Sequence, residues 1–107
     1  MVARTWNGTA TRDRIDAYLA HLRDRTLPAL GSVAGHRGAF VLRRPAGDHV
    51  AVTVITLWES AESIAHFAGA DPERAVVPAE ARALLSTWDE RAVHWEVAEA
   101  TDLWLNV

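Results

Sequence analysis

A histidine and a glutamate alternate close to the end of the chain. In the run HWEV, His94 and Glu96 are two residues apart, and residues two apart on a strand point to the same face of a sheet. A histidine that titrates near neutral pH can remove a phenolic or α-keto proton, and a carboxylate can orient it. The pair predicts a general base at His94 beside Glu96; the alternative is a strand edge that faces solvent.

Aromatic residues are numerous for a chain of 107 residues. Trp6 and Trp58 stand at ends of predicted strands, where pockets of barrel-like folds open, and Phe67 follows in a predicted helix. Aromatic walls suit a flat substrate. Tyr18 lies on the apolar stripe of the first predicted helix, so its hydroxyl could reach a cavity and act as an acid or base. Core packing is the alternative for each of them, and it is the expectation for Trp95.

Two further residues complete the predicted substrate-binding set. Arg43 could pair with an anionic substrate, although the adjacent Arg44 and the turn after it also fit a solvated hairpin end. Leu84 is expected to face inward from the helical segment that follows Pro78.

Composition excludes several kinds of chemistry. The chain has no cysteine, and all of its 11 basic residues are arginine, so thiol nucleophiles, disulfides, thiolate metal sites and lysine Schiff bases are ruled out. The net charge of −3 and the scattered arginines argue against a nucleic-acid partner. The histidines show no metal-ligand spacing, so neither a metal nor a cofactor is expected.

Targeting signals are missing from the sequence as given. The first residues lack a basic segment followed by an apolar run, and no stretch approaches the roughly 20 apolar residues that span a bilayer. A cytoplasmic protein without a membrane partner is therefore expected.

Six elements are predicted in the order β-α-β-β-α-β, from alternating runs and from apolar residues at helical spacing. The predicted strands are Val2 to Trp6, Ala39 to Arg44, His49 to Trp58 and Arg91 to Ala98. Asn7-Gly8 should close the first strand as a turn. The predicted helices run from Thr11 to about Leu27, where Pro28 should end the first, and from Ser60 to Ser86 in two or three pieces, one of them starting at Asp71-Pro72-Glu73.

The segment from His49 to Gly69 organises the rest of the fold. Its strand is apolar or β-branched on both alternating faces, so neither face suits water. Ser60 then stands where a helix N-cap belongs, and Gly69 is a plausible left-handed stop.

This order predicts an α+β, ferredoxin-like domain over residues 1–100, with a four-stranded antiparallel sheet and helices on one face. The other face would be an apolar patch larger than monomers usually expose, so a second copy is expected to cover it in a homodimer. Residues 101–107 form a C-terminal tail that is expected to pack on its own domain or on the partner subunit.

Several runs carry a resemblance to a known family. The run TLWESAESIAHFAGADPERAVVPAEARALL with HWEV, VLRR and ARTWNG resembles the antibiotic biosynthesis monooxygenase family of dimeric α+β barrels, over nearly the whole chain to Val97. The resemblance implies a protomer whose sheet packs on the partner's sheet, with a small-molecule cavity between sheet and helices.

The resemblance is incomplete at the functional positions. The cofactor-free oxygenases of this superfamily match the chain at Trp58, but they have an asparagine and a tyrosine at the positions of Val54 and Ile64. The haem degraders have a tryptophan at the position of Phe67 and an iron-ligating histidine at that of Val77, which argues against haem.

Three functions follow as hypotheses. The first is a cofactor-independent monooxygenase that removes a proton from a small aromatic or polyketide-type phenol or enol and lets the anion react with dioxygen, with His94 as base. The second is an oxygen-independent cyclase, isomerase or lyase in the same pocket, with His94 and Tyr18 as base and acid. The third is a non-catalytic homodimer that binds a small hydrophobic ligand.

Overall fold

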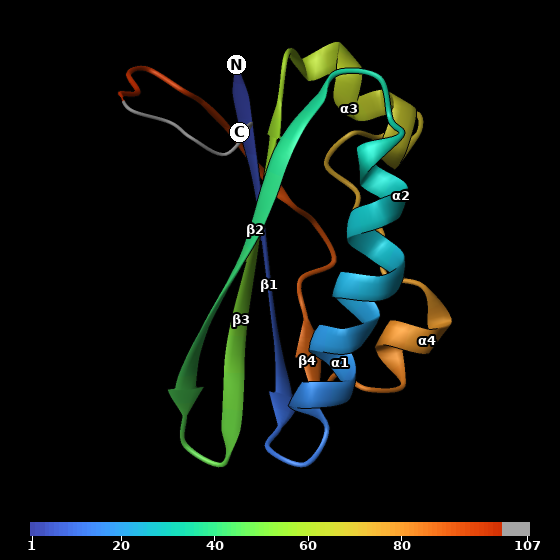
Figure 1. Cartoon of the computed structure of the whole chain (residues 1–107), viewed down its shortest axis with the longest axis vertical. Helices are drawn as coiled ribbons and strands as arrows, with labels where there is room; N and C mark the ends of the chain where they lie inside the picture. The colour runs from blue at the N-terminus through green and yellow to red at the C-terminus, as the bar shows by residue number, and fades with distance from the viewer. Residues whose placement is uncertain (102–107) are drawn as a thin grey trace.

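One antiparallel sheet carries all of the helices on one of its faces in the computed structural model, which describes residues 1–101 (Figure 1). The strands are β1 (Val2–Thr11), β2 (His36–Ala46), β3 (His49–Trp58), β4 (Thr87–Trp88) and β5 (Val93–Glu96). They lie in the order β2-β3-β1-β4, and β5 also pairs with β1. The predicted ferredoxin-like α+β fold is confirmed.

The first strand is longer than predicted. β1 pairs with β3 from Val2 opposite Trp58 to Thr11 opposite His49, so the predicted turn at Asn7-Gly8 is wrong. A Cβ at Gly8 would lie only 2.9 Å from the Trp6 ring and 3.1 Å from the Thr87 carbonyl oxygen. The glycine is therefore needed for a close approach of an indole and a neighbouring strand.

The last strand of the prediction is two short strands. β4 pairs with Gly8 and Thr9 of β1, and β5 pairs with Val2 to Thr5. Between them the chain leaves the sheet, and the Ala92 N–H donates to the Glu73 carbonyl at 2.7 Å. The predicted strand from Arg91 to Ala98 is thus too long, because Arg91 and Ala92 pair with Arg74 and Glu73 instead of with β1.

The predicted hairpin is confirmed. β2 and β3 are joined by only Gly47 and Asp48, since Ala46 pairs with His49. Gly47 has a φ of 62°, the left-handed backbone that two-residue hairpin turns require. Pro45 is tolerated inside β2 because β2 is an edge strand of the sheet.

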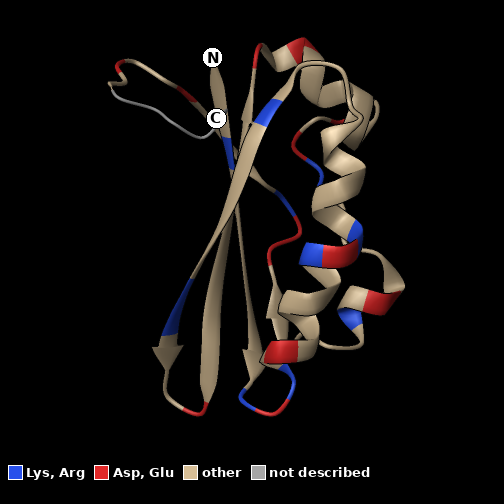
Figure 2. Cartoon of the chain, in the orientation of Figure 1, with Lys and Arg blue, Asp and Glu red and all other residues tan. Residues whose placement is uncertain are grey.

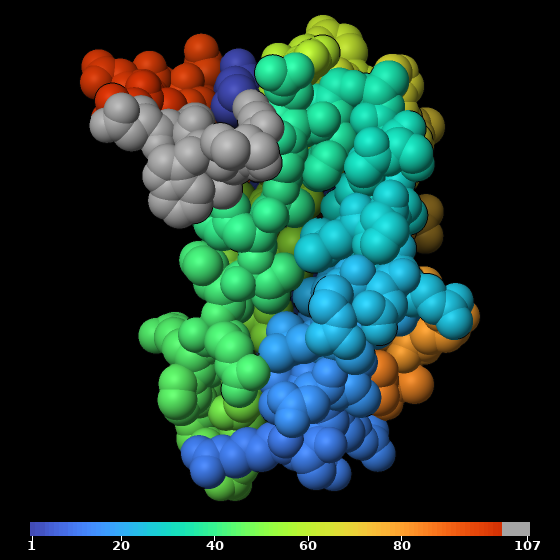
Figure 3. Space-filling model, in the orientation of Figure 1, coloured from blue at the N-terminus to red at the C-terminus, as the bar shows by residue number. Residues whose placement is uncertain are grey.

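The first helical segment does not end at Leu27. It consists of α1 (Ile15–His21), a π-helical turn η1 (Leu22–Thr26) and α2 (Leu27–Gly31), and these three form an arm that runs beside β2 (Figure 3). The Leu27 N–H donates to the Leu22 carbonyl, five residues back. A proline ring clashes with the carbonyl four residues earlier in an α-helix, and the wider π turn lets the arm continue through Pro28.

The second helical region begins as predicted. The Ser63 N–H donates to Oγ of Ser60 at 3.3 Å at the start of α3 (Ala61–Ala68), and Gly69 ends the helix with a φ of 85°. After it, residues 69–78 form the α3–α4 loop, where Asp71 to Arg74 make a single hydrogen-bonded turn instead of the predicted helical piece. The short α4 (Ala79–Arg82) follows Pro78.

The core has two clusters on the helix-covered side of the sheet. The first contains Ala10, Ile15, Tyr18, Leu22, Val50, Val52, Ala81 and Leu85, and the second contains Leu30, Trp58 and Ile64 with Phe67 against them. Trp95 is in neither, because β5 turns it to the opposite face, where 58% of it is exposed; the prediction of a core residue is wrong.

The opposite face of the sheet is uncovered within residues 1–101. Leu42, Val93 and Trp95 are each about half exposed on it. Charged residues gather on helices, loops and strand ends, and the middle of the sheet carries few (Figure 2). None of the helices within residues 1–101 is long and apolar enough to cross a membrane.

Candidate functional site

A pocket lies between the inner face of the sheet and the helical arm, where the two core clusters do not meet. Its wall is formed by Arg4, Trp6, Tyr18, His21, Leu22, Thr26, Leu30, Val54, Thr56, Phe67, Val76, Val77, Pro78 and Ala81. The volume is about 70 Å³, smaller than the roughly 300 Å³ at which ligand sites usually begin. A substrate must be small, protrude from the mouth or displace part of the wall.

Arg4 is the one arginine in this wall. It is 5% exposed, although the guanidinium is a charged group that is costly to bury. Nη2 donates to the Arg74 carbonyl at 2.8 Å, and the guanidinium carbon lies 5.7 Å from the centre of the Phe67 ring. Nη1 is buried with no hydrogen-bond partner among the described residues.

Aromatic rings hold Arg4 from one side. Phe67 stacks on Trp58 with ring centres 6.0 Å apart, and the Trp58 Nε1–H donates to Oγ1 of Thr56 at 2.8 Å. Trp58 is fully buried and lies behind Phe67, outside the pocket wall. Its indole positions the ring that Arg4 contacts.

A polar row crosses the sheet at this level. Thr56 of β3, Arg4 of β1 and His94 of β5 are direct neighbours in the strand register, so all three point to the helix-covered face. Burial, and then the charge of Arg4, lower the pKa of His94, while Glu73 and the Pro72 carbonyl act in the other direction. His94 is therefore neutral at neutral pH. Its Nε2 is buried and has no partner within residues 1–101.

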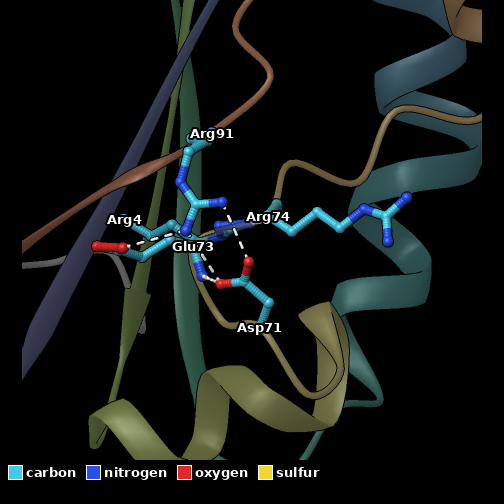
Figure 4. Close-up of polar contacts among 5 residues, drawn as sticks. All are labelled: Arg4, Asp71, Glu73, Arg74 and Arg91. Carbon is cyan, nitrogen blue, oxygen red and sulfur yellow. Dashed lines mark hydrogen bonds and ion pairs between the residues drawn. The ribbon is translucent and has the colours of Figure 1, made fainter.

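An ion-pair cluster fixes the α3–α4 loop beside this row (Figure 4). Arg91 binds both carboxylate oxygens of Asp71, each at 3.1 Å, and Oε2 of Glu73 at 3.3 Å. Arg74 also pairs with Arg91 as an isolated β-bridge. Because the Arg74 carbonyl accepts from Arg4, the cluster sets where the Arg4 guanidinium lies.

Tyr18 and His21 reach the pocket from the helical arm. Tyr18 is buried, and burial raises the pKa of its hydroxyl, so the group stays protonated and can donate a hydrogen bond. His21 is the last residue of α1 and is half-buried. An imidazole in a pocket wall can accept a proton from a ligand.

The structure places the predicted site residues in three settings. Trp6, Tyr18 and Phe67 line the pocket, and the Trp6 Nε1–H is tied to the Asp89 carbonyl at 2.8 Å. Trp58 and His94 lie next to pocket residues without lining it. Glu96, Arg43 and Leu84 lie away from the wall: Glu96 and Arg43 are exposed, and Leu84 packs against the first core cluster.

Sequence reasoning missed Arg4, His21, Thr26 and Thr56. Arg4 had a detectable signal, because it alternates with Val2 and Trp6 in a strand whose inner face is otherwise apolar. The predicted strand from Val2 to Trp6 already contained this alternation, but the sequence does not show that helices cover this face of Arg4. The two positions at which the chain departs from the cofactor-free oxygenases differ in setting: Val54 lines the pocket, and Ile64 is fully buried in the core.

No group of three or more residues that could hold a metal ion occurs in the part of the chain that the structure describes. No family model matches the sequence, and no curated protein does. A solved structure from Chloroflexus aurantiacus J-10-fl, provisionally assigned as an antibiotic biosynthesis monooxygenase, is similar with 23% identity and a TM-score of 0.59. The similarity covers 94% of this chain and 95% of the other. At this identity the likeness establishes the fold alone.

Proposed function

We propose that the protein is a cofactor-independent monooxygenase-like enzyme that acts on a small, enolisable aromatic compound. The observation that carries the proposal is the aromatic pocket wall: Trp6 and Phe67 both line the pocket, and the Arg4 guanidinium places a positive charge beside Phe67. Such a wall excludes water and favours the anion of a bound phenol or enol over its neutral form.

The proposed reaction needs only the substrate and dioxygen. A base removes a proton from an activated CH₂ group, and the carbanion passes one electron to dioxygen. The radical pair joins as a hydroperoxide, and loss of water leaves a carbonyl. One oxygen atom of dioxygen is then in the product and the other is in water, so that atoms and electrons balance without an added reductant.

The roles follow from position. His21 lines the pocket and is the proposed proton acceptor, Arg4 stabilises the anion, and the Tyr18 hydroxyl donates to a substrate oxygen. His94 does not line the pocket, so its proposed part is indirect, through its neighbour Arg4. The sequence predicts His94 as the base and the pocket wall favours His21, and the two alternatives make opposite predictions for single variants.

Oxygen uptake by the metal-free protein tests the proposal. A panel of small single-ring compounds, each with a phenol or enol and an activated CH₂ group, should give uptake above the buffer rate, and His21→Gln should lower kcat by about 100-fold if it is the base. His94→Gln should then have a smaller effect. If His94→Gln lowers kcat and His21→Gln does not, the base is His94; if no compound reacts faster than in buffer, the oxygenase proposal is wrong.

An oxygen-independent cyclase, isomerase or lyase is the second candidate. Val54 lines the pocket where the cofactor-free oxygenases that the chain resembles have an asparagine; this difference counts against the oxygenase and supports a binding protein as much as a cyclase. Product formation at equal rates under nitrogen and air would select this candidate over the first. A protein that binds ligands but converts none of them under either gas would be a binding protein.

We also propose that the uncovered sheet face binds a second copy of the chain. Half-exposed Leu42, Val93 and Trp95 support this, because large apolar side chains on one face of a sheet are typical of an interface. The proposed partner would cover the side of the sheet that the helices leave open.

A further inference from the structure

We infer that the pocket binds a small organic monoanion, one of whose oxygens accepts a hydrogen bond from Nη1 of Arg4. This inference rests on the proposed function for the choice of pocket, and it adds the charge class of the ligand. It implies that the natural substrate carries a carboxylate or is bound already as its enolate or phenolate.

The first step of the argument is the unbalanced charge of Arg4. Arg4 is only 5% exposed, and it forms no ion pair with any of residues 1–101. The two acidic groups on the nearby loop, Asp71 and Glu73, are bound by Arg91 instead. Buried charges in proteins are normally paired or bind a ligand.

The second step is the free donor. The Arg74 carbonyl occupies Nη2 and the Phe67 ring contacts the guanidinium, so the plane of the group is held in place. Nη1 remains buried without a partner, while Arg4 itself lines the pocket. A buried donor that is left unsatisfied costs about 1–3 kcal/mol, and more when it is charged. A ligand oxygen at Nη1 would remove this cost.

The third step concerns the size and charge of the ligand. Arg4 is the one arginine among the pocket residues, and His94, its neighbour in the sheet, is neutral because burial and Arg4 lower its pKa. One negative charge therefore matches the site and two do not. The remaining wall is mostly apolar, and its volume of about 70 Å³ suits a single ring or a smaller branched acid.

Benzoate and benzamide test the inference because they have nearly the same shape and differ in charge. Isothermal titration of the wild-type protein should give an affinity for benzoate at least about tenfold higher than for benzamide, the usual gain for a hydrogen bond to a charged group. Equal affinities, or tighter binding of benzamide, would overturn the inference. This comparison needs no variant.

Variants locate the effect. Arg4→Gln should abolish the preference for benzoate and retain weak binding of benzamide. Arg25→Gln, which changes an exposed arginine of the helical arm, should retain the preference. Circular dichroism confirms folding of both variants. If Arg4→Gln does not fold, the chemical shift of the Arg4 side-chain N–H groups in the wild-type protein provides the location: it should change with benzoate and not with benzamide.

Two combinations separate this inference from the proposed function. A protein that prefers benzoate through Arg4 but consumes no oxygen with any substrate contradicts the oxygenase proposal and supports the anion site. A protein that oxidises neutral substrates and shows no preference for benzoate overturns the anion site and leaves the oxygenase proposal intact.

Discussion

Arg4 and His94 lie directly opposite each other on β1 and β5, and each keeps one buried nitrogen without a partner within residues 1–101. The two strands bring a fixed cation and a titratable imidazole to one face of the sheet. Protonation of His94 would place a second positive charge beside the first, and this arrangement has consequences for pH dependence.

Stability should fall as pH falls through the histidine range. The pKa of His94 is lowered in the fold from its ordinary value of about 6.5, first by burial and then by Arg4. Between the lowered pKa of folded His94 and its ordinary pKa, the unfolded chain binds more protons than the folded chain. The contribution of His94 to the free energy of unfolding is therefore present above the ordinary pKa and is lost as pH falls through the lowered one. Chemical denaturation from pH 8 to 5 measures the slope.

His36 contributes in the same direction, because burial also lowers its pKa. His94→Gln and His36→Gln should therefore each reduce the slope, and the double variant should nearly remove it. A His94→Gln protein with the wild-type slope would contradict the lowered pKa of His94.

Loss of the loop ion pairs should affect ligand binding more than stability. Arg91 and its partners Asp71 and Glu73 are all more than half exposed, and solvent screening leaves such pairs little effect on stability. Arg91→Gln should therefore leave the free energy of unfolding nearly unchanged. It should weaken benzoate binding several-fold, because the loop that carries the Arg74 carbonyl no longer holds Arg4 in place.

The matched control for Arg91 is Arg37→Gln. Arg37 also forms an exposed ion pair, with Glu59 at 3.0 Å, but it has no link to the α3–α4 loop. Equal losses of benzoate affinity in the two variants, measured by titration calorimetry, would show that the loop does not position Arg4.

Substitution of Gly35 should be strongly destabilising. Gly35 has a φ of 87°, and a Cβ there would overlap Oγ and Cβ of Ser63 at the start of α3. Strain and overlap together should cost Gly35→Ala more than about 2 kcal/mol. Gly31→Ala is the control, since nothing lies within 4 Å of its added Cβ, and it should change the free energy of unfolding by less than about 1 kcal/mol. Urea denaturation compares the two.

A charge on the open face of the sheet should dissociate the proposed dimer. Leu42 is 49% exposed there, and Leu42→Glu should shift the molar mass in light scattering from dimer to monomer, because a carboxylate would be buried without a partner. Val76 is similarly exposed, at 47%, but lies on the α3–α4 loop, so Val76→Glu should leave the mass unchanged. A wild-type protein that is monomeric at micromolar concentrations would refute the dimer.

Local signals explain what could be predicted from the sequence. β3, the β2–β3 hairpin and the start of α3 each depend on neighbouring residues: an apolar run, a two-residue turn and the Ser60 cap. Trp6, Tyr18 and Phe67 lie in the pocket wall. Their positions follow from local patterns, since alternating residues of a strand share a face of the sheet and apolar residues at helical spacing face the core.

The errors concern features that depend on distant residues. Gly8 indicates a turn in the sequence, but the Trp6 ring and β4 pack against it. Trp95 is apolar, yet the pairing of β5 with β1 directs it away from the helices. The partners of Arg4 come from the α3–α4 loop and α3, 63 or more positions away in the chain, so no local pattern reveals that Nη1 lacks one.

The π-helical turn determines which residues of the arm face the pocket. Relative to a continuous α-helix, such a turn holds one extra residue, and one residue corresponds to roughly 100° of rotation about the axis. Leu22 and Thr26 within this turn and Leu30 after it all line the pocket. In a regular α-helix with the same residues, the eight positions from Leu22 to Leu30 would place the two side chains roughly 80° apart about the axis, so the wider turn is what keeps both of them on the pocket side.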